Sequence, residues 1–289
     1  NFMRILFCTD GSKISFNALK NISRWVKNAF VDTICVIDWS FLPSEINIED
    51  KNFTYSCSNM AETILEYAKE EIEKLGLNTD ECIKNCGTAI EGILEQADKK
   101  DYDLILMGSH GKKGLQKWLG SVSQAIINSS EISDYIAKEE NKAQKLLLTT
   151  DGTMCSLEIL NKIIPDMKLE DKEIHICMVN EDPNFLFLDG TLDTNWLLEI
   201  QKQQQIYASK AIEDIKRLLT NYGISVYETS ILSGIPAQKI IDYARSRDID
   251  MIVMGYKNKS KLDRFLTGSV SKRVLENVTS DIWLARCKS

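Results

Sequence analysis

Hydrophobic residues in the first half of the chain follow two alternating periods. Short uninterrupted apolar runs at 5–8, 33–37 and 104–107 are typical of strands that are buried on both faces of a sheet. Apolar residues spaced three and four apart at 14–26 and 60–75 predict amphipathic helices. Strands that alternate with helices predict a parallel sheet covered on both faces, which binds ligands beyond the carboxyl ends of its strands.

The other segments continue this alternation. We expect an irregular segment at 40–59, strands at 81–85 and 134–137, and helices at 89–99 and 121–128. The second half repeats the order with a longer helix at 196–222 and ends on an apolar strand at 282–285.

The sequence also repeats itself at an offset that drifts by only a few residues. Three matched pairs carry the repeat: 4–11 with 145–152, 103–108 with 250–255, and 120–123 with 268–271. Because the segments keep their order, we infer a tandem duplication with a short polar join near 139–144. We predict two packed domains, residues 1–140 and 141–289.

Composition and charge narrow the class of protein. Of the 289 residues, 44% are hydrophobic and 27% are charged, which is typical of a globular chain and not of a disordered one. No apolar run approaches the ~18 residues of a membrane span, so we expect no membrane partner. The net charge of -7 argues against a nucleic-acid partner, which requires a concentrated basic surface.

The eight cysteines form no CxxC pair, and several lie inside apolar runs. We expect them to be buried, reduced thiols in a cytoplasmic protein, with neither a metal site nor a disulfide framework.

Candidate chemistry follows the predicted strand at 104–107. The chain continues through Gly108, Gly111, Lys112 and Lys113 to Gly120-Ser121, where a helix begins. Glycines let the backbone approach a phosphate, and a helix N-terminus offers free N–H groups to an anion. We expect the hydroxyls of Ser121 and Ser123 to add hydrogen-bond donors for a phosphate. A glycine-containing turn with a serine cap would look the same, but its repetition after the same strand in both halves favours an anion site.

Known nucleotide-binding motifs help to decide which kind of nucleotide site these loops resemble. The chain contains no Walker A sequence and no GxGxxG after its first strand, which disfavours P-loop and dinucleotide sites. The pattern resembles the universal stress protein family in its tandem form, whose ATP-binding signature is Gly, two residues, Gly, nine residues and Gly-Ser/Thr. The resemblance implies two doubly wound parallel-sheet domains of the adenine-nucleotide alpha-hydrolase-like fold.

Both copies depart from that signature. Only eight residues separate Gly111 from Gly120 in the first, and Asn258 replaces the second glycine in the other. By resemblance, ATP or ADP, with or without Mg²⁺, would contact Asp10 and Asp151 at the first strands and the backbone of Val36 and Val179 at the second. The remaining residues that the resemblance assigns to nucleotide binding are Gly108, Gly111, Gly120, Ser121, Val122, Gly255, Asn258, Gly268, Ser269 and Val270.

An enzyme would need a general base, and no candidate base occurs at the same position in both halves. His110 lies in the glycine loop but its counterpart is Lys257, and His175 lies in an apolar run typical of a structural residue. Slow ATP hydrolysis with Asp10 or Asp151 and magnesium remains one alternative, and an interaction module with decayed sites is another. An ATP pyrophosphatase fits less well, because Thr9-Asp10-Gly11-Ser12 stands where that class has Ser-Gly-Gly-x-Asp-Ser.

The resemblance also predicts how the halves associate. Single-domain members commonly dimerise through the last strand, whose equivalents here are 134–137 and 281–285. We therefore expect an intramolecular pseudo-dimer, and the sequence leaves further homo-oligomerisation open.

Overall fold

The computed structural model describes the chain except residues 1, 39–50, 111–118, 182–193, 257–268 and 288–289, and for 51–55, 194 and 269 only the backbone is described. Within the described residues, no helix combines the length and the apolar character needed to cross a membrane.

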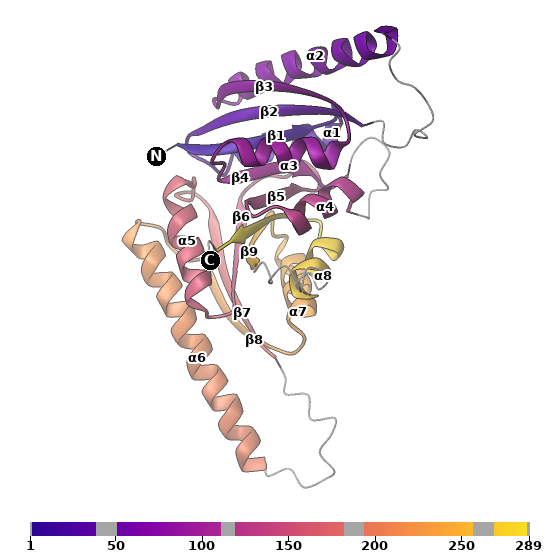
Figure 1. The fold of residues 1–289 in the computed structure, drawn as a ribbon. Helices are drawn as coiled ribbons and strands as arrows, with labels where there is room; N and C mark the ends of the chain where they lie inside the picture. The colour runs from indigo at the N-terminus through magenta and orange to yellow at the C-terminus, as the bar shows by residue number, and fades with distance from the viewer. Residues whose placement is uncertain (1, 39–50, 111–118, 182–193, 257–268, 288–289) are drawn as a thin grey trace, which may run out of the picture.

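The first half alternates strands and helices as expected (Figure 1). Its strands and helices are β1 (Met3–Thr9), α1 (Lys13–Ser23), β2 (Ala29–Asp38), α2 (Lys51–Lys74), β3 (Asn78–Gly87), α3 (Ala89–Lys99), β4 (Leu104–Gly108), α4 (Ser121–Ser129) and β5 (Ser133–Ala137).

The second half repeats that order. Its elements are β6 (Lys145–Thr150), α5 (Met154–Ile163), a short 3-10 turn at Ile164–Asp166, β7 (Glu173–Asn180), α6 (Thr194–Asn221), β8 (Glu228–Ser233), α7 (Pro236–Arg247), β9 (Met251–Tyr256), α8 (Ser269–Asn277) and β10 (Asp281–Arg286).

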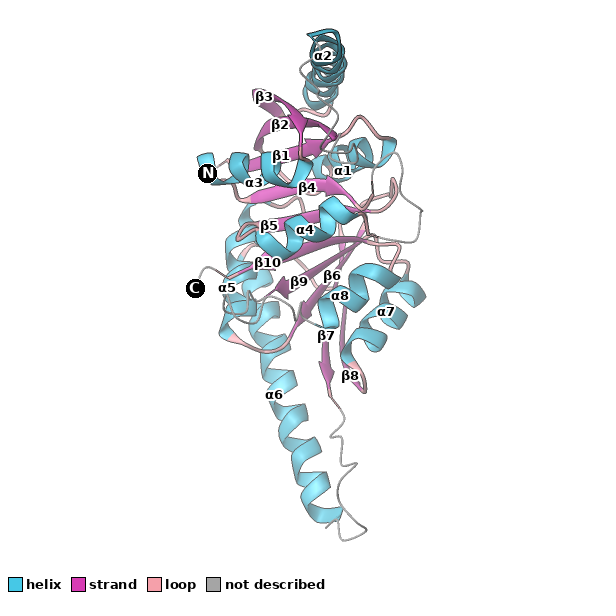
Figure 2. Ribbon diagram, turned by 45° about the vertical axis from the view of Figure 1, so that its right-hand side comes forward, coloured by secondary structure: helices cyan, strands magenta, loops and turns pink. Residues whose placement is uncertain are grey.

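All ten strands form one continuous sheet (Figure 2). Their order is β3-β2-β1-β4-β5-β10-β9-β6-β7-β8, so each half has the same parallel winding and the two halves meet at their last strands. The β5–β10 pair is antiparallel, with Trp283 opposite Tyr135. The predicted pairing of the last strands, and with it the intramolecular pseudo-dimer, is confirmed.

Two apolar cores lie on the two faces of this sheet. One contains side chains from α1, α2, α5 and α6, and the other contains side chains from α3, α4, α7 and α8. Alternate residues of a strand enter opposite cores: Ile5 and Phe7 contribute to the first, and Leu6 and Cys8 to the second. Each core thus runs across both halves, so the halves share their hydrophobic burial.

Two sequence-based boundaries are wrong. The predicted irregular segment 40–59 overlaps α2, which already begins at Lys51 because its buried stripe extends back to Cys57. The helix predicted at 14–26 ends at Ser23, and Val26 instead forms an antiparallel bridge with Met167 of the second half. Trp25 and Val26 are fully buried, which explains why they continue the helical apolar pattern.

A buried ion pair joins the last strands of the two halves. The guanidinium Nη2 of Arg286 in β10 donates to Asp134 Oδ2 in β5 at 2.7 Å and to the carbonyl of Ile127 at 2.6 Å. Burial raises the pKa of Asp134 to about 6, while the neighbouring Arg286 charge opposes that shift. The same guanidinium carbon lies 4.6 Å from the centre of the Tyr256 ring.

Asp281, the first residue of β10, is also buried but is surrounded by neutral donors. Its carboxylate accepts hydrogen bonds from Tyr135 Oη at 2.7 Å, Asn21 Nδ2 at 2.7 Å, Asn141 Nδ2 at 3.0 Å and the Lys138 amide at 2.8 Å. Burial raises its pKa to about 6, and these hydrogen bonds act in the opposite direction. The Asp281 carboxylate therefore links β5, α1 and the join between the halves through hydrogen bonds.

We expect Arg286→Met to lower the free energy of unfolding by about 3–5 kcal/mol, because it leaves the Asp134 carboxylate buried without its partner. The double variant Asp134→Leu with Arg286→Met should recover much of the loss. Denaturant unfolding at neutral pH measures both. Lys216→Met, which breaks an exposed ion pair with Glu213, is the control and should change stability by less than about 1 kcal/mol.

Candidate functional site

The candidate site of the first half lies where the winding of the sheet reverses. Strand β1 pairs with β2 on one side and with β4 on the other. The loops after β1 and β4 therefore both leave from the carboxyl ends of the strands, and they run in opposite directions. Open parallel sheets bind ligands at this position. Asp10 follows β1 and Gly108 ends β4, so the fold brings these two predicted residues to one edge.

The loop after β1 is a tight turn fixed by side-chain hydrogen bonds. Gly11 has φ +76°, a left-handed conformation that glycine adopts without strain. The Ser12 amide donates to Asp10 Oδ1 at 3.0 Å, and the Ser12 hydroxyl caps α1 by accepting from the Ser15 amide at 3.3 Å. The first turn of α1 is therefore already satisfied by its own cap.

The equivalent turn in the second half is also fixed by hydrogen bonds to its aspartate. Asp151 Oδ1 accepts from the Thr153 amide at 3.0 Å, the Thr153 hydroxyl at 2.7 Å and the Ser156 hydroxyl at 2.6 Å. Gly152 repeats φ +76°, and the ring of Tyr207 from α6 lies against it, so that a Cβ built there would be 2.5 Å from Tyr207 Cε1.

Strand β4 ends in close contact with α1. A Cβ built on Gly108 would lie 2.7 Å from Ile14 Cγ2 and 3.1 Å from the Ile14 carbonyl carbon, so only glycine fits. In the second half, a Cβ on Gly255 would lie no closer than 3.8 Å to the nearest atom, the Cδ1 of Ile159. The two halves therefore place different steric demands on the same motif position.

The N-terminus of α4 has no side-chain cap. Gly120 occupies the cap position and its amide donates to the Ser109 carbonyl at 2.7 Å. Among the described residues, no side chain accepts from the first turn of the helix. The helix dipole and the first-turn N–H groups thus favour an anion at this end. Ser121 is exposed at the start of α4, beside these N–H groups.

Ser123 differs from expectation. Its hydroxyl was expected to be available to a phosphate together with that of Ser121, but it donates to the Gly108 carbonyl at 2.9 Å and lies buried. Ser123 therefore fixes the end of β4 to α4. Sequence reasoning missed this role because hydroxyl direction depends on the packing of α4 against the strand.

The other predicted residues are divided between the core and the undescribed segments. Val36 in β2 belongs to the core on the second face, and the partly buried Val122, Val179 and Val270 pack against that core. Gly255 lies in β9, and Ser269 begins α8. Gly111, Asn258 and Gly268 lie outside the described residues.

Two residues that the sequence left unassigned also adjoin the site. Ser109 is buried, its amide donates to the Ala137 carbonyl at 2.8 Å, and its hydroxyl lies 3.0 Å from His110 Nδ1. A Cβ on Gly120 would be 3.3 Å from the Cα of His110, so the His110 backbone lies next to the start of α4. The sequence signal that could have identified both residues is their position directly after Gly108, at the start of the glycine loop.

His175 is structural, as its apolar surroundings indicate. It is buried, and its Nδ1 lies 3.0 Å from Tyr243 Oη. Burial lowers its pKa, with Glu228 acting in the opposite direction. No group of three His, Cys, Asp or Glu side chains suited to a metal ion occurs in the described residues.

Four cysteines form disulfides, which corrects the expectation of eight reduced thiols. Cys57 in α2 is bonded to Cys86 in β3. Cys155 in the first turn of α5 is bonded to Cys287, directly after β10. The fold brings together residues 29 and 132 positions apart, which the spacing of cysteines along the chain could not reveal.

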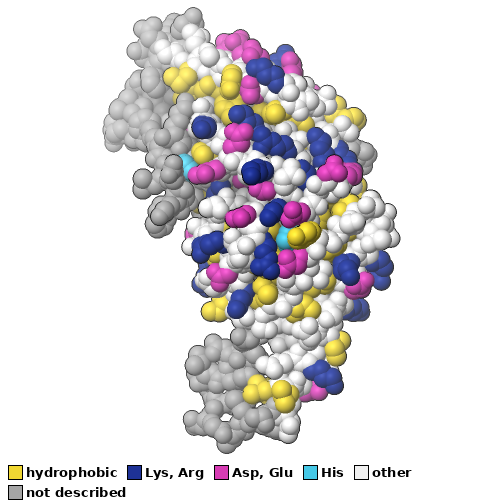
Figure 3. Space-filling model, turned by 180° about the vertical axis from the view of Figure 1, so that it is seen from behind, with side chains coloured by type: hydrophobic (Ala, Val, Ile, Leu, Met, Phe, Trp, Pro, Cys, Tyr) yellow, Lys and Arg dark blue, Asp and Glu magenta, His cyan; other side chains and the backbone are white. Residues whose placement is uncertain are grey.

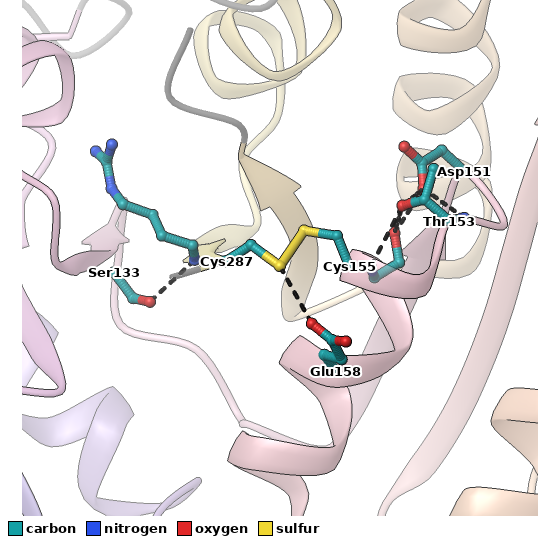
Figure 4. Close-up of a disulfide and its surroundings, with 8 residues drawn as sticks. Ser133, Asp151, Thr153, Cys155, Glu158 and Cys287 are labelled. Carbon is teal, nitrogen blue, oxygen red and sulfur yellow. Dashed lines mark hydrogen bonds between the residues drawn. A yellow bond between two sulfur atoms is a disulfide. The ribbon is translucent and has the colours of Figure 1, made fainter. Parts of the chain in front are cut away.

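The Cys155–Cys287 disulfide lies beside the Asp151 turn (Figure 4). Cys155 is flanked by the residues whose hydroxyls donate to Asp151, and Glu158 Oε2 lies 3.8 Å from the Cys287 sulfur. Next to Cys287, the Arg286 amide donates to the Ser133 hydroxyl at 3.1 Å. One covalent bond therefore connects the candidate site of the second half to the strand that joins both halves.

Charged side chains of both signs are interspersed on the surface seen in Figure 3, and no broad basic patch covers that face. The predicted lysines of the glycine loops, Lys112, Lys113 and Lys257, lie outside the described residues.

The sheet order defines a doubly wound α/β unit that is built twice in one chain, and its first copy has a glycine-capped helix N-terminus at the switch point. A family model described as the universal stress protein family matches residues 1–138 and 142–286. The chain therefore belongs to that family.

Individual relatives agree with the duplication. The universal stress protein Slr1230 of Synechocystis is 22% identical over 304 aligned positions, covering 95% of this chain and 96% of its own. Universal stress protein MJ0531 of Methanocaldococcus jannaschii is 30% identical over 146 positions, 50% of this chain and 84% of its own. A universal stress protein structure from Archaeoglobus fulgidus superposes with a TM-score of 0.68 at 20% identity, covering 99% of this chain and 98% of that one.

We expect Gly108→Ala to reduce the free energy of unfolding by about 1–3 kcal/mol, because the new Cβ would overlap Ile14 and the adjoining backbone. Gly255→Ala is the matched control in the second half and should be nearly neutral, since its Cβ meets only ordinary contacts. Denaturant unfolding of both variants measures the difference. Equal losses would contradict the asymmetry between the two strand ends.

In protein purified without reductant and then denatured, we expect only Cys8, Cys35, Cys82 and Cys177 to react with a maleimide. Peptide mapping under non-reducing conditions should recover Cys57 linked to Cys86 and Cys155 linked to Cys287. Cys57→Ser should make Cys86 reactive and leave the second bond intact. Labelling of all eight cysteines without reductant would contradict the pairing.

Proposed function

We propose that this protein binds an adenine nucleotide, ATP or ADP, beyond the carboxyl ends of β1 and β4, and that occupancy changes its shape or partners in a stress or signalling response. The observation that supports this most is the uncapped N-terminus of α4 beside the Asp10 turn. A negatively charged phosphate at that terminus would accept from N–H groups that no side chain satisfies, and would interact favourably with the helix dipole.

The other residues of the proposal have distinct roles. Gly120 gives the backbone room for a phosphate, and the Ser121 hydroxyl adds a donor. Asp10 supplies a carboxylate for the ribose or for Mg²⁺, a cation that prefers oxygen ligands. The backbone at Val36 would meet the adenine, as the family resemblance implies. The second half would use Asp151, Val179 and the start of α8 in the same way.

We propose that the first half is the stronger site. Asp151 already accepts three hydrogen bonds, and Tyr207 lies against Gly152, whereas α4 presents an uncapped end next to Asp10. The first loop also keeps all its glycines. We retain the cytoplasm as the predicted location.

An interaction module without a ligand is the second candidate. It is favoured by the departures of both loops from the nucleotide signature and by the tight hydrogen bonding of Asp151. Slow ATP hydrolysis is a weaker candidate, which would require multiple turnovers that are lost in Asp10→Asn.

Freshly purified protein should release ATP or ADP when it is denatured, as chromatography of the supernatant would detect. Calorimetric titration with ATP, ADP and cyclic AMP then compares the nucleotides. Retention of a folded chain with neither released nor bound nucleotide would favour the interaction module.

Gly120→Val combined with Gly268→Val should weaken nucleotide binding at least about tenfold, the equivalent of about 1.4 kcal/mol, because valine branches would occupy the approach to the helix N-terminus. Asn128→Val, at the exposed far end of α4, is the matched control and should bind as the unsubstituted protein does. Circular dichroism checks the fold of each variant. Unchanged affinity in the glycine variant would place the nucleotide elsewhere.

A further inference from the structure

A groove of about 530 Å³ lies between α1 and α2 of the first half, on the sheet face opposite α3 and α4. Its size falls within the range of small-molecule sites. The lining residues are Gly11, Lys13, Phe16, Asn17, Lys20, Thr63, Ile64 and Tyr67. Of these, only Gly11 belongs to the turn of the candidate nucleotide site, and Asp10, Gly108 and Gly120 do not line the groove.

One part of the groove is aromatic. The rings of Phe16 from α1 and Tyr67 from α2 meet edge to face, with their centroids 4.8 Å apart. Tyr67 is about half exposed, and Ile64 lies one turn before it on α2. This wall offers ring faces and aliphatic surface to a flat apolar group.

The α1 side of the groove is polar. Lys13, Asn17 and Lys20 recur at intervals of four and three residues, which places them on one face of the helix. Lys13 forms no ion pair with any described residue, and the Lys20 ammonium lies 3.8 Å from Glu140, which also contacts Arg24 at 3.3 Å. The groove therefore carries an excess of positive charge.

Asn17 lies between the two lysines on the same face of α1 and lines the groove. The residue as a whole is 4% exposed, and neither of its amide atoms is among the buried side-chain atoms that lack a partner. Because Asn17 lines the groove, its amide can donate a hydrogen bond to a bound molecule.

The region of the second half that corresponds to the groove has a different structure. Gly152, the counterpart of Gly11, has the Tyr207 ring packed against it from α6, whereas Gly11 borders the groove between α1 and α2. The tandem repeat thus has a tyrosine over this glycine in one half and a lined groove beside it in the other.

We propose that this groove is a binding site for a small organic anion with an aromatic ring, such as an aromatic carboxylate, separate from the nucleotide site. Its ring packs on Phe16 and Tyr67, its acid group lies between Lys13 and Lys20, and it accepts a hydrogen bond from the Asn17 amide. The site needs no nucleotide and no residue of the second half.

Naphthoate and the matching neutral naphthyl alcohol test the proposal by protein-observed NMR and calorimetry on the full chain. We expect naphthoate to bind saturably, one per chain, with shifts concentrated on the residues that line the groove. The alcohol should bind at least about tenfold more weakly, because it lacks the charge. Equal affinity of acid and alcohol, or shifts elsewhere, would overturn the proposal.

Three variants test the residues. Lys13→Gln and Asn17→Asp should each weaken naphthoate binding, the second more strongly because it adds a negative charge to a buried position. Tyr67→Ala should weaken it through loss of the ring. Lys69→Gln on α2 and Tyr222→Ala in the second half are matched exposed controls and should leave the affinity unchanged. Lys13 is exposed, so its variant stays informative if Asn17→Asp unfolds; unchanged binding in it would refute the site.

Naphthoate and the nucleotide should also bind independently of each other. Gly120→Val with Gly268→Val should keep full affinity for naphthoate even where nucleotide binding is lost, and saturating ATP should not displace naphthoate. Loss of naphthoate binding in this variant, or its displacement by ATP, would assign the naphthoate to the nucleotide site and overturn the proposal.

Discussion

The antiparallel pairing of β5 with β10 is the interaction on which the rest of the molecule depends. It turns two five-stranded sheets into one, and it lets each hydrophobic core run across both halves. The pairing has an unusual cost, since each of its two strands carries a buried aspartate. Asp134 is offset by a guanidinium and Asp281 by four neutral donors. Two buried carboxylates on paired strands are thus stabilised by different kinds of partner.

The two halves also differ where ligands are expected, at the carboxyl ends of their strands. The first half ends β4 on a glycine that touches α1 and starts α4 without a side-chain cap. The second half has a roomier strand end, a carboxylate held by three donors and a disulfide beside it. The two halves therefore differ within the last strands, at the ends of β4 and β9, and in the turns that follow β1 and β6.

Much of the fold could be predicted from the sequence, because burial on two faces imposes long apolar runs and the repeat doubles the evidence. The order of elements followed from those patterns, and the pairing of the last strands followed from the family resemblance. The start of α2 did not, because its first turns, residues 51–58, consist mainly of polar residues such as Asn, Thr and Ser, which have low helix propensity. Nor did the bridge between Val26 and Met167, whose apolar spacing imitates another turn of helix.

The candidate site was only partly predictable. Glycines and the aspartate at strand ends are local signals, and the structure brings Asp10, Gly108 and Gly120 to one edge. The direction of the Ser123 hydroxyl and both disulfides depend on contacts between elements far apart in the chain. Such contacts leave no trace in one sequence. Which residues bind a nucleotide stays a prediction, and so do the domain limits 1–140 and 141–289.

The direction of the strands has a consequence for communication between the halves. Because β5 and β10 run antiparallel, the strands of the two halves point in opposite directions, and their carboxyl ends lie at opposite edges of the common sheet. A single small ligand therefore cannot bridge the two proposed nucleotide sites. Any influence of one proposed site on the other would have to pass through the shared sheet and the cores that pack on it, across the strands that hold Asp134 and Asp281.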